Sequence, residues 1–321
     1  MIDDDMSVCG VDMVINYKLQ LYTELSVQLQ TELDAEAEKP VRDALEKWLE
    51  PIFTDKAKDV DLRFFSDAED EIKHQIQEEI NDNKTSYTIY LPKENYTHLA
   101  VANFKDNGQL RLFGGEHSTT MELRQIETGD IPCSKTGVFT ARLPMNVNDS
   151  TTNFEVHLYM VSCAVALVID PSQCPDLVDI EGSVQGTADK FIIRDSVFVY
   201  DDRAPRILME NITIEKSNTQ ARKLRAEEEN TDRLCLATVG MPSEDENQWS
   251  IRVVSTLTNN RHTTTSLLVE TPLKAGTLRI FKCQMGKNGD LVPDTGDADS
   301  QDLGASVELD WSEGGGFDIE I

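Results

Sequence analysis

Short strand-like segments, separated by turn-forming residues, run through the whole chain and limit the folds open to it. They are rich in Val, Ile, Thr, Tyr, Phe and Leu, and many alternate apolar with polar residues. Such alternation indicates a half-buried strand. Short strands with frequent turn signals are typical of antiparallel sandwiches and not of repeated βαβ units. The expected strands are residues 11–29, 85–91, 99–104, 110–113, 138–143, 154–169, 191–199, 234–239, 249–257, 264–270, 277–285 and 306–311.

Two turn sequences predict hairpins. Asn107-Gly108 and Asn288-Gly289 each lie between apolar runs. Asn and Gly tolerate the positive φ angles that tight hairpin turns require. We therefore expect the strands on either side of each turn to pair.

Two segments have a helical pattern instead. In residues 40–53, apolar residues including Val41, Leu45 and Trp48 recur at steps of three and four. In residues 67–81, Ile72, Ile76 and Ile80 recur every four residues. Both patterns predict amphipathic helices that lie over a sheet.

The length of 321 residues favours two domains. The polar, turn-forming segment 146–153 precedes a long apolar run and marks the best boundary. We predict a mainly β fold with antiparallel sandwich domains at residues 1–150 and 151–321. Both helical insertions, about residues 40–53 and 67–81, belong to the first domain.

The net charge of −28 argues against nucleic-acid binding, because such binding needs clusters of Lys and Arg. The most apolar run, residues 161–169, is too short to span a bilayer. The acidic N-terminus lacks the basic and apolar parts of a signal peptide. Two readings stay open, a cytosolic protein or one whose signal peptide has been removed.

The sequence indicates no catalytic site, cofactor or metal site. None of the five histidines has metal-ligand spacing, and nucleophile-elbow and phosphate-loop motifs are missing. Each histidine is interpreted as a surface or structural residue. The six cysteines contain no C-x-x-C pair, so mostly free thiols and at least one disulfide both remain open. The acidic segment 290–302 could offer oxygen ligands to calcium, but it lacks the EF-hand register, and a solvated loop is the alternative.

A series of segments follows along the chain in order. They are IDDDMSVCG leading into VDMVINYKLQLYTEL, then YTIYLPKENYTHLAVANF, FEVHLYMVSCAVALVID and the closing WSEGGGFDIEI. Together these segments resemble the FimB/Mfa-type fimbrial anchor subunits of Bacteroidales. The resemblance implies two transthyretin-like sandwich domains in a cell-surface lipoprotein of the outer membrane. It also implies an acylated cysteine next to the acidic opening. Cys9 does not follow an apolar stretch, so we expect that cysteine immediately before Ile2.

The resemblance further implies a structural role in a fimbrium, with stalk subunits as partners. Subunits of such fimbriae join by strand addition, in which an extended segment of one fills a groove in the next. Stalk subunits open this groove by losing their N-terminal strand, whereas the anchors resemble members that keep it. In this chain the retained strand corresponds to residues 11–25. The C-terminal segment then becomes the expected contact, formed by Phe317, Asp318, Ile319, Glu320 and Ile321, in which apolar and acidic residues alternate.

Two alternatives stay open. The C-terminal segment could instead complete its own domain's sheet. The chain could also be a surface carbohydrate-binding or adhesin module, since the same fold serves both roles. That function requires exposed aromatic platforms, and Trp249 and Trp311 are the candidates. The position in the fimbrium (base, shaft or tip) and the partner's identity are not fixed by the sequence.

Overall fold

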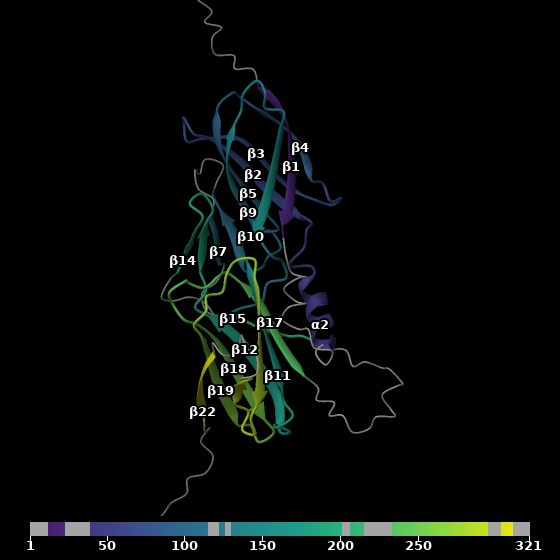
Figure 1. Cartoon of the computed structure of the whole chain (residues 1–321), viewed down its shortest axis with the longest axis vertical. Coiled ribbons are helices and arrows are strands. Elements are labelled where there is room, and N and C mark those ends of the chain that lie inside the picture. The colour runs from purple at the N-terminus through teal and green to yellow at the C-terminus, as the bar shows by residue number, and fades with distance from the viewer. Residues whose placement is uncertain are drawn as a thin grey trace, which may run out of the picture.

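The computed structural model describes residues 12–22, 39–114, 122–125, 130–200, 206–214, 233–294 and 303–310. These residues form an elongated molecule made mainly of β-sheets (Figure 1). One end carries a seven-stranded sheet, and the other end carries a five-stranded and a six-stranded sheet. This arrangement confirms the mainly β, sandwich-like fold expected from the alternation of residues.

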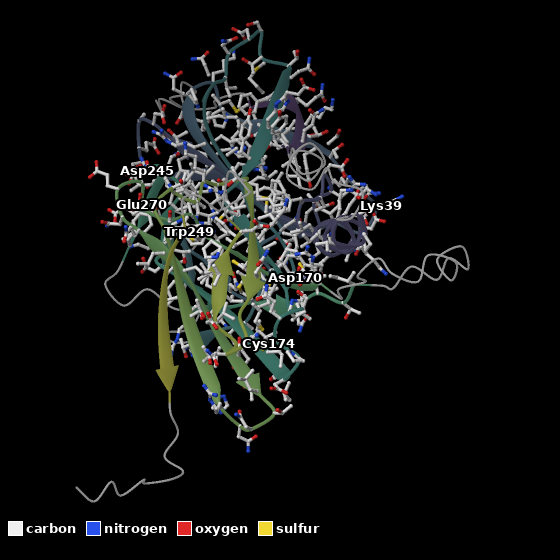
Figure 2. The ribbon with its side chains drawn as sticks, turned by 60° about the horizontal axis from the view of Figure 1, so that its bottom comes forward. Lys39, Asp170, Cys174, Asp245, Trp249 and Glu270 are labelled. Carbon is white, nitrogen blue, oxygen red and sulfur yellow. The ribbon has the colours of Figure 1, made fainter. Side chains whose placement is uncertain are left out.

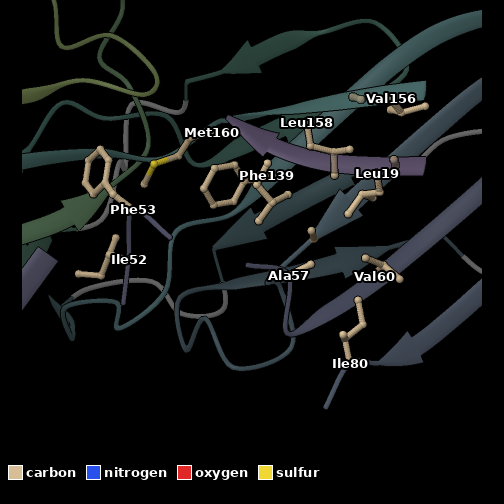
Figure 3. Close-up of a cluster of buried hydrophobic side chains, with 14 of the residues drawn as sticks. Leu19, Ile52, Phe53, Ala57, Val60, Ile80, Phe139, Val156, Leu158 and Met160 are labelled. Atoms are coloured by element: carbon tan, nitrogen blue, oxygen red, sulfur yellow. The ribbon is translucent and has the colours of Figure 1, made fainter. Parts of the chain in front are cut away.

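The seven-stranded sheet, here called the curled sheet, has the strand order β3-β2-β5-β9-β10-β1-β4. Its edge strands β3 and β4 follow one another in sequence and are joined by residues 80–85, so the two edges of the sheet approach each other. The inward side chains, including Leu19, Val60 and Leu158, fill the space it encloses (Figure 3). The strands are β1 (Met13–Tyr22), β2 (Asp59–Ser66), β3 (Ile72–Glu79), β4 (Ser86–Leu91), β5 (Asn95–Ala102), β9 (Phe139–Asn146) and β10 (Asn153–Met160).

The helix predicted at residues 67–81 is wrong, because Ile72–Glu79 forms strand β3 and pairs antiparallel with β2. An apolar residue at every fourth position satisfies a helix, whose period is 3.6 residues. It equally satisfies a strand, because four is a multiple of two. Ile76 lies opposite Leu62 of β2 and packs against the core of the curled sheet.

The other end of the molecule is a sandwich of two sheets. The central sheet has the order β16-β17-β11-β20-β21, and the outer sheet has the order β22-β19-β18-β12-β15-β8. Their facing side chains form one apolar core that includes Leu167, Trp249 and Phe281. The strands are β8 (Asp130–Ile131), β11 (Cys163–Asp170), β12 (Leu177–Gln185), β15 (Arg206–Leu208), β16 (Glu210–Asn211), β17 (Leu234–Gly240), β18 (Trp249–Leu257), β19 (His262–Val269), β20 (Leu278–Met285), β21 (Leu291–Pro293) and β22 (Leu303–Asp310).

Helix α2 (Lys39–Leu49) confirms the helix predicted at residues 40–53, which ends earlier than expected. Its buried residues Val41, Leu45 and Leu49 belong to a cluster that also holds Ala164 and Ala166 of β11. The helix lies beside β11 and β17 (Figure 1). The central sheet is therefore buried on both faces, which explains why β11 is almost continuously apolar.

The strand expected at residues 154–169 is two strands that belong to different sheets. Strand β10 ends at Met160 in the curled sheet, and β11 begins at Cys163 in the central sheet. The Ser162 hydroxyl accepts a hydrogen bond from the Val138 N–H at 3.1 Å at this junction. The break was missed because no Gly, Pro or Asn separates the alternating segment of β10 from the apolar segment of β11.

Both hairpin predictions fall on real turns, but only one joins a paired hairpin. Met285 of β20 pairs with Leu291 of β21 around the turn at Gly289, whose φ is +82°. Asn107-Gly108 instead connects β5 to β6 (Leu110–Phe113), which lies in a different sheet. The Asn107 side chain bonds to Ser134 and Thr136, so the turn is fixed by residues outside the expected hairpin.

A small sheet, with the order β14-β13-β7-β6, combines strands from both halves of the chain. It contains β6, β7 (Glu122–Gln125), β13 (Lys190–Ile192) and β14 (Val197–Val199). Phe191 from this sheet packs in one cluster with Phe65 and Leu99 of the curled sheet. The halves of the chain are thus interlocked, and the domain boundary at residue 150 stays a prediction.

Candidate interaction surfaces

The buried histidine is a structural residue. His98 is 0% exposed, and its ring stacks on Phe64 with centroids 4.3 Å apart. Its Nδ1 lies 3.0 Å from the Arg63 carbonyl oxygen, and its Nε2 lies 2.9 Å from the Tyr17 hydroxyl. Because a carbonyl only accepts, Nδ1 donates to it, and Nε2 accepts from Tyr17. Burial lowers the pKa of His98 to about 4, so the ring is neutral at pH 7.

This arrangement predicts a loss of stability on mild acidification. The pKa of His98 is about 4 in the folded chain and about 6.5 when unfolded, so the unfolded state binds the extra proton. The contribution is complete above pH 6.5 and falls by about 3 kcal/mol as the pH drops to 4. We expect urea unfolding at pH 7 and pH 4.5 to show most of this difference.

The comparison should be made with His98→Gln, which removes the titrating ring. This variant is expected to unfold more easily at pH 7 but to lose part of the pH dependence. His262 is exposed, so His262→Gln provides the matched control for the effect of the substitution itself. An unchanged pH profile in His98→Gln would contradict the assignment.

The described cysteines are free thiols, and their surroundings disfavour the thiolate form. Cys133, Cys163, Cys174, Cys235 and Cys283 form no disulfide, and all except Cys133 are buried. Burial raises the pKa of each of these thiols, to about 12 for Cys235 and Cys283. Raised pKa values disfavour the thiolate, which is the reactive form. Cys9 lies outside the described residues.

The acidic segment considered for calcium is described only as far as Asp294. Asp290 belongs to the β20–β21 turn, where its backbone oxygen accepts a hydrogen bond from Gly286 N–H at 2.7 Å. Among the residues that the structure describes, no group of three or more His, Cys, Asp or Glu could hold a metal ion. Residues 295–302 lie outside the described part, so calcium binding and a solvated loop both stay predictions for this segment.

Trp249 is a core residue and not a surface platform. Its side chain is 1% exposed, and its Nε1 donates to the Thr271 carbonyl oxygen at 2.8 Å. Its ring lies 5.8 Å from that of Phe281 across the sandwich core. Trp249 stands at the start of β18 and pairs with Val269 of β19, so it is labelled close to Glu270 in Figure 2. Trp311, the other candidate platform, lies outside the described residues.

The outer sheet ends in strand β22. Residues 303–310 pair antiparallel with residues 262–269 of β19 along their whole length. In the described part of the chain, no strand hydrogen-bonds to the other side of β22. The strand lies at the margin of the sandwich (Figure 1). The five residues predicted as the partner contact, Phe317 to Ile321, follow this strand but lie outside the described residues.

A second surface was not anticipated from the sequence. Strands β4, β1 and β10 are neighbours, and every second side chain along them is exposed. This exposed face carries Tyr90 at one end and Tyr22 with Tyr159 at the other. Alternation in the sequence shows that β1 has one buried and one exposed face. It does not show which strands lie beside β1 in the sheet.

A sequence model of the fimbrillin-A associated anchor proteins Mfa1 and Mfa2 matches residues 46–266. No curated protein matches the sequence. Within the described residues, no helix has both the length and the apolar content needed to cross a bilayer.

Two solved structures share the fold at low sequence identity, and a third has a lower structural similarity. A candidate adhesin from Bacteroides thetaiotaomicron has a TM-score of 0.55 at 8% identity, covering 89% of this chain and 95% of its own. A candidate polysaccharide-binding protein from the same organism has a TM-score of 0.51 at 10% identity, covering 87% and 93%. The fimbrial anchor protein Mfa2 from Porphyromonas gingivalis has a TM-score of 0.46 at 11% identity, covering 85% and 90%. Because the family model spans more than half of the sequence, this chain belongs to the fimbrillin-A associated anchor protein family.

Proposed function

We propose that this chain is a non-catalytic fimbrial subunit that serves as the anchoring or accessory subunit and holds its neighbours by β-strand addition. Membership of the anchor protein family supports a fimbrial role at the cell surface. In this proposal, a lipid at the N-terminus attaches the chain to the outer membrane. The chain folds as two transthyretin-like domains, residues 1–150 and 151–321. Stalk subunits are its partners.

The observation that carries this proposal is the position of β22 at the end of the outer sheet. An edge strand presents unpaired N–H and C=O groups along one side, and a second chain can bond to them. Main-chain hydrogen bonds then supply affinity, while alternate side chains set the register. A neighbouring subunit could therefore extend the outer sheet here without any change in the sandwich core.

The residues after β22 suit the same role. In Phe317, Ile319 and Ile321, apolar residues alternate with Asp318 and Glu320. That pattern fits a strand with one face buried in a groove and the other in solvent. Glycines occupy positions 314–316, immediately before this segment, and glycine permits backbone conformations in which a chain changes direction. Pairing of this segment within its own domain is the alternative.

Deletion of residues 317–321 tests the proposal. We expect the deletion to reduce co-purification with stalk subunits at least about tenfold, since losing a strand's side-chain contacts costs more than about 1.4 kcal/mol. Ile319→Asp should have a similar effect because it places a charge on the apolar face. Glu320→Gln is the matched control and should bind as the wild type does.

Unfolding curves of each variant separate lost binding from lost folding. If the segment instead completes its own sheet, the deletion lowers stability and co-purification together. Full co-purification of a stably folded deletion variant would refute the tail as the contact.

A further inference from the structure

We propose that Tyr22 and Tyr159 form a binding platform for a neutral glycan on the exposed face of the curled sheet. The platform is independent of strand addition and lies on different strands from β22. It consists of the two tyrosines with their neighbours Gln20 and His157 on β1 and β10.

The geometry of the pair sets it apart from isolated exposed residues. Strands β1 and β10 run parallel, and their register places Tyr22 directly beside Tyr159. The ring centroids are 5.6 Å apart, with an angle of 57° between the ring planes. Tyr22 is 49% exposed and Tyr159 is 57% exposed. Two large aromatic rings thus share one patch of surface, although single exposed apolar residues are the ordinary case.

The chemistry of the pair fits a sugar ring. The face of an aromatic ring is electron-rich and attracts the positive C–H edges of a saturated ring. The tyrosine hydroxyls add hydrogen-bonding groups at the rim of the same surface. One step back along the strands, exposed Gln20 and His157 lie side by side and supply donors and acceptors for sugar hydroxyls.

The charge of this face favours a neutral ligand. Lys18 and Glu155 lie beside each other in the next register step, with Nζ and Oε1 2.9 Å apart, so their charges compensate. Beyond them lie Asn16 and Asn153, whose side chains hydrogen-bond to each other at 3.2 Å. In a chain of net charge −28, this strip is close to neutral. A basic partner would be drawn to other surfaces, and a polyanion would be repelled by the molecule as a whole.

The exposed face contains its own control residue. Tyr90 of β4 is 54% exposed and lies opposite Val14 of β1, at the far end of the same face. It has the same side chain and similar exposure, but no aromatic ring contact with Tyr22 or Tyr159 is found among the described residues. A loss of binding specific to the pair therefore distinguishes the platform from general stickiness of tyrosine.

Titration calorimetry of the full chain with cello-, manno- and galacto-oligosaccharides tests the proposal. We expect saturable binding of at least one of these probes. Tyr159→Ala and Tyr22→Ala should each weaken it about tenfold or more, and Tyr159→Trp should retain it. Tyr90→Ala should bind as the wild type does. Unfolding curves must first show that each variant is folded.

Three outcomes would overturn the platform. They are absence of saturable binding to every probe, an equal loss in Tyr90→Ala, and a dimer in sedimentation analysis that Tyr159→Ala converts to monomer. The last would assign the face to a second copy of the chain. Deletion of residues 317–321 should leave glycan binding unchanged, so failure of strand addition and failure of the platform can be told apart.

Discussion

Trp249→Ala is expected to lower the free energy of unfolding by about 3–5 kcal/mol, the usual range for removing a large buried aromatic side chain. Trp249 is 1% exposed and packs in the sandwich core with Phe281. Alanine would leave a cavity between the central and outer sheets, and the Thr271 carbonyl would lose the indole donor at 2.8 Å. Urea unfolding of both proteins at pH 7 measures the difference.

Trp249→Phe separates the two contributions. It keeps most of the apolar volume but removes the hydrogen bond, so a smaller loss of about 1–2 kcal/mol is expected. A cost below about 1 kcal/mol for Trp249→Ala would place the indole outside the core. In that case Trp249 would again become a candidate platform for sugars.

Arg63→Met is expected to cost about 3–5 kcal/mol, because it leaves a buried carboxylate without its cation. Arg63 is 4% exposed and Asp61 is 0% exposed on the same strand, β2. Arg63 donates to Asp61 from Nε at 2.9 Å and from Nη2 at 3.0 Å, and Gln75 of β3 donates to the same carboxylate. Unfolding in urea again provides the measurement.

The double variant Asp61→Leu with Arg63→Met shows whether the stability lost in Arg63→Met comes from the unpaired carboxylate. Replacing a whole buried ion pair by apolar residues is often neutral, whereas removing one partner is not. We expect the double variant to recover most of the stability lost in Arg63→Met. Equal losses in the single and double variants would show that packing, and not the unpaired charge, dominates at this position.

Several elements could be predicted because their signals are local. Helix α2 is predicted by apolar residues such as Val41 and Leu45, which recur at steps of three and four along the chain. The β20–β21 hairpin is predicted by the turn sequence Asn288-Gly289. The segments quoted for the anchor family also lie along the chain in order, and the family match confirms that resemblance. The domain boundary at residue 150 and the partner contact at residues 317–321 remain predictions.

Other elements failed because one pattern fits two structures. The spacing of Ile72, Ile76 and Ile80 suits both a helix and a strand, and only pairing with β2 selects the strand. Likewise, the strand-like segment from residue 154 to residue 169 contains no Gly, Pro or Asn to mark a break. It breaks after Met160 because its two parts belong to different sheets.

From its sequence alone, this chain is determined to be mainly β and strongly acidic, because composition and alternation act between near neighbours. Its relation to fimbrial anchors comes from the resemblance of a series of segments, which the family match confirms. Only the tertiary structure brings Tyr22 beside Tyr159, and Tyr17 against His98. The ladder that joins β1 to β10 pairs residues 137 positions apart, as in the contact between Asn16 and Asn153. Strand alternation defines two faces, but which strands become neighbours depends on packing of the whole chain.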